Sequence, residues 1–341
     1  MAKEIGSEFW NVPTASAESG VFPQSTQWYL SGRSALQAII AELNDIKTVA
    51  MPSWCCDSMV KPFADAGIKV DFYPVYLQQG LVQEINTDCD ALFLMDYFGF
   101  SSDAPKLSEY KGIVIRDITH SVFSAVYNDA QYYFGSLRKW CGVLTGGYAR
   151  TKDGHALIAG NADASDYTGL RAEAMRLKDC YISGTADTSG NIVCDKKYLK
   201  IFDSAEDILE NIGIAPAAEN DVYLARLLDV DFIVSRRRAN ARILMDAFSD
   251  WLIFKKLRDT DCPMFVPVIV PDNERNALRR FLISRDIYCP VHWPVSKYHR
   301  LNENERRLYD NELSLVCDQR YTEEDMRYMV DTIKAFRKEW Q

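Results

Sequence analysis

Residues 112–151, GIVIRDITHSVFSAVYNDAQYYFGSLRKWCGVLTGGYART, contain three short apolar segments separated by polar residues. These segments, GIVIRD, QYYFGSL and GGYART, begin at Gly112, Gln131 and Gly146. They are rich in β-branched and aromatic residues, as strands buried on both faces of a sheet are. This part of the chain therefore predicts three strands with polar side chains at their ends.

The sequence before this stretch has the same character. Similar strand segments begin at Thr48, Lys69 and Ala91, and helical patterns begin at Ser34 and Asp57 between them. Alternation of strands and helices is typical of a mostly parallel sheet covered by helices on both faces. We therefore expect an α/β protein with a three-layer large domain.

Beyond Lys152 the pattern changes to helices, with one further strand, MFVPVIV, from Met264. Expected helices begin at Leu170, Ala205 (with Ser204 and Asp207 at capping-box spacing), Glu274 and Thr322, and a long helical pattern runs from about Asp221 to Trp251. A chain of 341 residues is longer than one core usually supports. We expect an N-terminal arm and large domain over residues 1–235, and a small C-terminal α+β domain over residues 236–341.

Composition excludes several classes of function. The formal net charge of −9 argues against a nucleic-acid surface, because phosphate binding requires a basic face. The nine cysteines have no regular spacing, so free thiols are expected and no metal site is predicted. The first ten residues do not resemble a signal peptide, and no apolar stretch approaches the roughly 20 residues that cross a bilayer. The expected location is the cytoplasm.

Two polar residues follow the strand segment GIVIRD. Asp117 ends this segment, and His120 lies three residues later. Ligands of such sheets bind at the carboxyl ends of the strands. From the residues alone, Asp117 is a candidate to hold a metal, to bind a ribose or to pair with a protonated ring nitrogen. A simple helix cap is an equally good explanation.

Lys139 follows the next strand segment, with Ser136 three residues before it. A lysine is a Schiff-base nucleophile only as the neutral amine, and burial or a neighbouring cation such as Arg138 favours that form. Ser136 is placed to bind a phosphate near the same lysine. The segment SGRSAL, from Ser31, also opens a helix whose free N–H groups can meet a phosphate.

Taken in order, these segments resemble the fold-type-I pyridoxal phosphate (PLP) enzymes, in particular the DegT/DnrJ-like sugar aminotransferases. The resemblance rests on SGRSALQA, MPSWCCDS, IRDITHS and GSLRKW followed by GG, and it continues in SRDIYCPVHWP and LSLVCDQRYTEEDM near the C-terminus. It implies an aspartate-aminotransferase-like large domain. The family's N-Y-R-M-like stretch, whose asparagine reaches the partner subunit's phosphate, has no match here.

The resemblance also implies roles for individual residues. Lys139 would form the Schiff base with PLP, Asp117 would pair with the pyridine nitrogen, and His120 would lie near the ring hydroxyl. Of the remaining implied cofactor contacts, one of two residues would lie against the ring face and three would bind the phosphate: Trp54 or Cys56 for the ring, and Ser34, Ala35 and Ser136 for the phosphate.

The implied activity is transfer of an amino group from glutamate or glutamine to a keto sugar, with a nucleotide-linked sugar expected, in nucleotide-sugar and polysaccharide biosynthesis. A homodimer with the active site at the subunit interface is expected, without nucleic-acid or membrane partners. The alternatives are elimination or carbon–carbon cleavage with the same cofactor, or a non-catalytic binding protein that kept the fold. A nucleotide-binding Rossmann protein ranks last, because no G-x-G-x-x-G follows a first strand.

Overall fold

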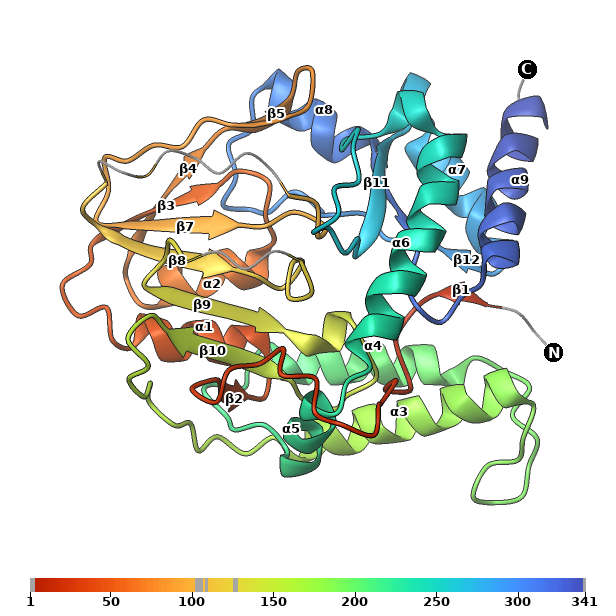
Figure 1. Ribbon diagram of the computed structural model, residues 1–341, viewed down its shortest axis with the longest axis horizontal. Helices are drawn as coiled ribbons and strands as arrows, with labels where there is room; N and C mark the ends of the chain where they lie inside the picture. The colour runs from red at the N-terminus through yellow and green to blue at the C-terminus, as the bar shows by residue number, and fades with distance from the viewer. Residues whose placement is uncertain (1–3, 102–106, 108–109, 125–127, 340–341) are drawn as a thin grey trace.

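The computed structural model describes residues 4–101, 107, 110–124 and 128–339. Its centre is a seven-stranded sheet of order β2-β10-β9-β8-β7-β3-β4 (Figure 1). Five neighbouring strands, from β4 to β9, are mutually parallel, while β10 and then β2 each run antiparallel to the strand before. The mostly parallel sheet is thus confirmed, with these strands: β2 (Gln27–Tyr29), β3 (Thr48–Pro52), β4 (Lys69–Tyr73), β7 (Ala91–Met95), β8 (Ile113–Asp117), β9 (Tyr132–Ser136) and β10 (Gly147–Thr151).

The central strands are buried on both faces, which explains their continuous apolar sequences. All five residues of β7 are buried, as are four of the five in β8. β8 departs from the apolar pattern at its last residue, Asp117, and at Arg116, whose guanidinium pairs with the carboxylates of Asp96 and Asp129. Because its charge is compensated, this arginine can occupy a central strand without breaking the layer.

Helices flank the sheet. Helix α1 (Gly32–Ile40) packs on β9 and β10, and α2 (Asp57–Asp65) packs on α1 and β4. Helices α3 (Ser165–Ser183) and α4 (Lys197–Leu209) pack against each other beyond the β2 edge of the sheet, at the bottom of Figure 1. The smaller elements of this part are a hairpin and one short helix: β5 (Val75–Leu77), β6 (Leu81–Gln83) and α5 (Glu219–Arg226).

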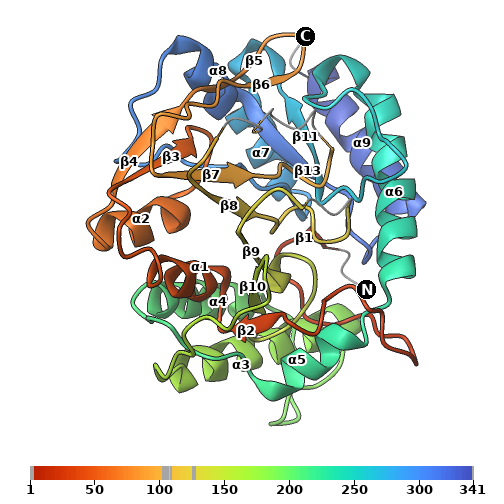
Figure 2. The ribbon, with the colours of Figure 1, turned by 60° about the vertical axis from the view of Figure 1, so that its left-hand side comes forward.

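The C-terminal part is a smaller α+β unit, as expected, drawn in blue in Figures 1 and 2. Helix α6 (Val230–Ala247) runs from the large domain into this unit and packs against its last helix and its first strand. The rest of the unit comprises β11 (Phe265–Ile269), α7 (Arg275–Ile283), β12 (Ile287–Tyr288), α8 (Glu303–Asn311), β13 (Glu312–Val316) and α9 (Glu323–Glu339), with β11 and β13 antiparallel. The boundary between 235 and 236 falls inside α6 and stays a prediction.

The N-terminal arm joins the C-terminal unit. Strand β1 (Ile5–Gly6) pairs in parallel with β12, so residues 282 positions apart share a two-stranded sheet. Glu4 strengthens this attachment, because its carboxylate pairs with Lys178 at 3.0 Å and with Lys196 at 2.9 Å. The arm is therefore fixed to both parts of the molecule.

Two helix predictions were wrong in detail. The long pattern from Asp221 to Trp251 forms two helices, because Asp229 breaks it and caps α6 by accepting the backbone N–H of Phe232 at 3.0 Å. Ser204 and Asp207 do not start a helix but lie inside α4. The last helix begins next to Thr322, where it was expected, and Asp325 accepts the backbone N–H of Thr322 at 2.8 Å.

All nine cysteines are unpaired thiols. Within the described residues, no group of three or more His, Cys, Asp or Glu side chains is arranged to hold a metal ion. The same part of the chain contains no helix with the length and apolar character needed to span a bilayer.

Candidate active site

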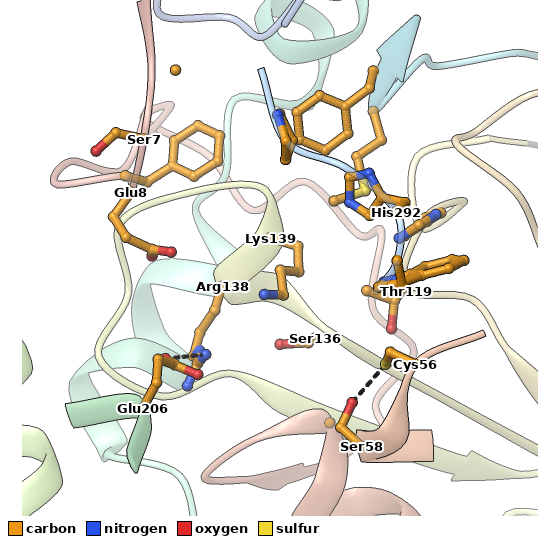
Figure 3. Close-up of a pocket in the computed structure, with 18 of the residues that line it drawn as sticks. Ser7, Glu8, Cys56, Ser58, Thr119, Ser136, Arg138, Lys139, Glu206 and His292 are labelled. Carbon is orange, nitrogen blue, oxygen red and sulfur yellow. Dashed lines mark hydrogen bonds and ion pairs between the residues drawn. The ribbon is translucent and has the colours of Figure 1, made fainter. Parts of the chain in front are cut away.

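A cavity of about 570 Å³ lies where the carboxyl ends of β8 and β9 face the C-terminal unit. Its volume is in the range of sites for small ligands and cofactors. The wall combines strand ends, the start of α1, the N-terminal arm, α4 and the C-terminal unit (Figure 3). Its polar residues include Glu8, Ser31, Ser58, Asp117, Thr119, His120, Ser136, Arg138, Lys139, Glu206 and His292.

Lys139 ends a short 3₁₀ turn, Leu137–Lys139, that directly follows β9. The turn is fixed because the N–H of Leu137 donates to the carbonyl of Gly146 at 2.7 Å, and because Trp140, the next residue, is fully buried. The Lys139 side chain is exposed to the cavity (Figure 3). No described residue hydrogen-bonds to its amine or pairs with it. The amine is therefore available to a ligand.

Asp117 is the last residue of β8 and is only 2% exposed. Its Oδ1 accepts the N–H of Thr119 at 2.8 Å, and none of the described basic side chains pairs with the carboxylate. Burial raises the pKa of Asp117 to about 6. A protonated ring nitrogen in the cavity would supply the missing positive charge.

His120 is buried at the cavity wall and packs parallel to the Trp293 ring, with 5.8 Å between ring centroids. Its Nδ1 lies 3.2 Å from the backbone N–H of Phe98 and accepts that hydrogen bond. Burial, and then the charge of Lys139, lower the pKa of His120 to about 3, so the ring is neutral. Because Nδ1 is an acceptor, Nε2 carries the hydrogen and acts as a donor.

The start of α1 and the end of β9 form a candidate anion site. A Cβ on Gly32 would lie 3.3 Å from the Cβ of Ser136, so these residues are in contact. Both line the cavity together with Arg33. The first N–H groups of a helix have no acceptor within the helix and attract anions. No described group hydrogen-bonds to the Ser136 hydroxyl, which leaves it available to the same anion.

Two residues expected at the phosphate are placed differently. The N–H of Ser34 donates to Ser31 Oγ at 3.2 Å, and the N–H of Ala35 donates to the Ser31 carbonyl at 3.0 Å. Neither Ser34 nor Ala35 lines the cavity. The N–H groups of Gly32 and Arg33, the first two residues of α1, are the candidate phosphate donors in the cavity wall.

The two ring-face candidates differ in position. Trp54 is fully buried behind the wall, where it stacks on Tyr97 and donates its indole N–H to the carbonyl of His292 at 2.6 Å. Cys56 lines the cavity, and its Sγ lies 2.8 Å from Ser58 Oγ (Figure 3). Of the two, only Cys56 is positioned to contact a ligand.

Sequence reasoning missed the contributions of the arm and of α4, whereas the C-terminal segment SRDIYCPVHWP, which carries His292 and Trp293 of the cavity wall, was part of the resemblance. The Arg138 guanidinium turns away from Lys139 and pairs with Glu206 at 2.7 Å (Figure 3). Glu8 faces Lys139 from the arm, and the charges of Arg171 and then Lys139 offset its burial and lower the pKa of Glu8 to about 2. No local motif marks Glu8 or Glu206, because each reaches the cavity from a distant segment.

We compared the chain with known proteins to find which of them share this architecture. No family model and no curated protein matches the chain. Solved structures do match over nearly all of it. PseC of Helicobacter pylori, an aminotransferase involved in the biosynthesis of pseudoaminic acid, has 14% identity and a TM-score of 0.64 over 96% of this chain and 99% of its own.

Two further neighbours agree. The sugar aminotransferase CalS13 of Micromonospora echinospora has 15% identity and a TM-score of 0.58, over 91% of this chain and 87% of its own. DesI, solved with its TDP-sugar product, has 14% identity and a TM-score of 0.61, over 91% of this chain and 80% of its own. The chain has the sugar-aminotransferase fold. The expected fold class is therefore confirmed, and the cavity occupies the carboxyl edge of the sheet in this aminotransferase fold.

Proposed function

We propose that the chain is a PLP-dependent aminotransferase that acts on a sugar. One observation carries the proposal: a lysine amine and a buried carboxylate, neither paired with any described residue, line one cavity together with a candidate anion site. This donor set fits PLP, which carries an aldehyde, a basic ring nitrogen and a phosphate. The assignment is also supported by the fold shared with sugar aminotransferases.

Each residue has a role that follows from its position. Lys139 would bind the aldehyde covalently, and Asp117 would keep the ring nitrogen protonated. His120 would donate from Nε2 to the ring hydroxyl, and Cys56 would contact the ring face. Ser136 Oγ and the first N–H groups of α1, those of Gly32 and Arg33, would bind the phosphate.

The bound cofactor supplies an electron sink for the carbon that loses its proton. Asp117 sustains that capacity because its carboxylate holds the ring nitrogen in the charged form. Lys139, displaced by the incoming amine, would take the proton from the substrate carbon on Nζ and return it to the carbon on the other side of the transferred nitrogen. Two such half-reactions move an amino group from a donor, which becomes a keto acid, to a keto acceptor.

The finer proposal concerns substrates and assembly. We propose a nucleotide-linked keto sugar as acceptor, supported by the TDP-sugar product named for DesI. Glutamate or glutamine is the proposed amino donor. We also propose a cytoplasmic homodimer whose partner subunit completes the phosphate site. A different segment of the partner would do this, because the sequence lacks the family's asparagine segment.

The test uses the purified, PLP-loaded protein and the Lys139→Ala variant. After borohydride reduction and digestion, the mass of the cofactor should be found on the peptide that contains Lys139, and Lys139→Ala should carry none. L-glutamate or L-glutamine should convert the cofactor to pyridoxamine phosphate, and the variant should slow this conversion by about 10²–10⁴-fold. Lys152→Ala, which changes an exposed lysine just after β10, is the matched control.

The outcomes separate the alternatives. Cofactor mass on a different lysine, or no cofactor bound, would overturn the site. Turnover of an amino acid without pyridoxamine phosphate would indicate elimination or carbon–carbon cleavage. Labelled Lys139 with no reaction toward any amino acid would indicate a binding protein.

A further inference from the structure

The C-terminal unit contributes a histidine to the cavity wall, and three hydrogen bonds tie it to a buried acid. His292 follows β12, and its Nδ1 lies 2.8 Å from Ser314 Oγ. Ser314 Oγ lies 2.6 Å from Oε1 of Glu312, whose Oε2 accepts the backbone N–H of His292 at 2.7 Å. Glu312 and Ser314 are wholly buried in β13. His292 lines the cavity, and its Nε2 bonds to no described residue.

These contacts allow two arrangements of the protons. If Glu312 is ionised, Ser314 donates to the carboxylate and accepts from Nδ1–H of His292, so Nε2 faces the cavity as an acceptor. If Glu312 is protonated, it donates to Ser314, and Ser314 donates to Nδ1. The ring hydrogen is then on Nε2. The protonation state of Glu312 therefore decides whether Nε2 of His292 faces a ligand as a hydrogen-bond acceptor or as a donor.

The surroundings of Glu312 favour the protonated acid. Among the described residues, its two carboxyl oxygens hydrogen-bond only to uncharged groups, and Arg275 of α7 uses its Nη1 on the Glu312 backbone carbonyl at 3.1 Å. Burial without a charged partner disfavours a carboxylate, and it raises the pKa of Glu312 to about 8 despite the charge of Arg275.

The histidine itself is uncharged. Burial holds the pKa of His292 well below its usual range, and His120 of the β8 end and Lys139 of the β9 end add to this effect. With the ring neutral, the position of its single N–H hydrogen is set by what Ser314 donates or accepts.

We propose that protonated Glu312, acting through Ser314, holds His292 as the Nε2–H tautomer, so that the C-terminal unit offers the substrate a neutral hydrogen-bond donor. The matching ligand group is an oxygen acceptor, such as a sugar hydroxyl, a carbonyl or a carboxylate. Glu312 and Ser314 are positioning residues, since they act through His292. The identity of the ligand rests on the proposed function, whereas the tautomer does not.

The sequence contains four histidines, which makes the tautomer directly measurable. In the cofactor-free protein labelled with ¹⁵N-histidine, long-range ¹H–¹⁵N spectra distinguish Nε2–H from Nδ1–H rings, and the signal missing from His292→Gln assigns His292. At pH 6.5 the ring should be Nε2–H. As the pH rises through about 8, the wild-type signal should shift toward Nδ1–H as Glu312 ionises.

Two variants test the link. Glu312→Gln keeps a donor to Ser314 and cannot ionise, so His292 should stay Nε2–H from pH 6.5 to 9.5. Ser314→Ala breaks the link, so the His292 signal should lose its response near pH 8. Unchanged signals of the other three histidines verify the fold. An Nδ1–H ring at pH 6.5 would overturn the proposal, as would the wild-type pH response persisting in either variant.

An activity measurement separates this inference from the proposed function. With an active enzyme, Ser314→Ala should raise KM for one substrate by roughly tenfold with a smaller change in kcat, as expected for loss of one hydrogen bond. If no amino acid reacts but the spectra behave as described, the proposed function fails and the role of Glu312 stands. If KM is unchanged, the assignment of His292 to the substrate fails.

Discussion

Asp117 is the residue whose properties depend most directly on a ligand. Its ordinary pKa of 3.8 becomes about 6 in the folded protein, because the carboxyl group is buried and has no basic partner among the described residues. The folded chain then binds this proton more tightly than the unfolded chain, so stability falls as the pH rises from about 4 to about 6. The difference corresponds to about 3 kcal/mol at most.

We therefore expect Asp117→Asn to stabilise the cofactor-free protein at pH 7 by up to about 3 kcal/mol, with no gain at pH 4. Urea unfolding at both pH values measures this difference. Asp207→Asn, at an exposed position of α4, should leave the unfolding midpoint unchanged. If the Asp117→Asn gain is equal at both pH values, ionisation of Asp117 is not its cause.

At the scale of single residues, the sequence predicted which polar residues stand at the ends of strands. Asp117, Ser136 and Lys139 all line the cavity because parallel strands deliver their carboxyl ends to one edge of the sheet. The same reasoning could not find Glu8, which reaches that edge from the arm, and His292 of the C-terminal unit was marked only by the resemblance of SRDIYCPVHWP. Their positions depend on how distant segments pack, and no local pattern records that packing.

Among the secondary-structure elements, strands with a continuous apolar sequence could be predicted, whereas a strand with buried polar residues could not. The strand β13, ELSLV, was not predicted because Glu312 and Ser314 interrupt its apolar pattern, yet both are buried. Their bonds to His292 satisfy them inside the protein. The break between α5 and α6 was missed for a similar reason. Asp229 is recognisable as the N-cap of α6 only once it is known that a new helix starts at Val230.

The start of α1 gives a prediction for a single element. Ser31 caps this helix by accepting the N–H of Ser34 at 3.2 Å, and the same turn forms the candidate phosphate site. Ser31→Ala should lower the free energy of unfolding by about 1 kcal/mol and weaken PLP binding measured by equilibrium titration. Ser165→Ala, at the exposed start of α3, should leave PLP binding unchanged. Unaltered affinity in Ser31→Ala would place the phosphate elsewhere.

For the whole molecule, Glu4 is one of the residues that join the arm to the α3–α4 pair. Lys178, its partner, has a side chain that is 0% exposed. Removing one partner of a buried ion pair leaves an uncompensated charge, and Glu4→Gln should therefore lower the free energy of unfolding by about 3–5 kcal/mol. The measurement is the midpoint of urea unfolding, with Glu18→Gln, an exposed position of the arm, as the control. Equal midpoints for both variants would show that the ion pairs of Glu4 add little to stability.

The pairing of Ile5 with Ile287 also sets an order of events during synthesis. When Ile5 leaves the ribosome, its partner strand has not yet been translated, and at 5–20 residues per second it follows roughly 15–60 s later. The large sheet can form in that interval, because its last strand ends at Thr151. The N-terminal strand must therefore stay unpaired until β12 has been translated. Attachment of the arm is a late step in folding, after the large sheet is able to form.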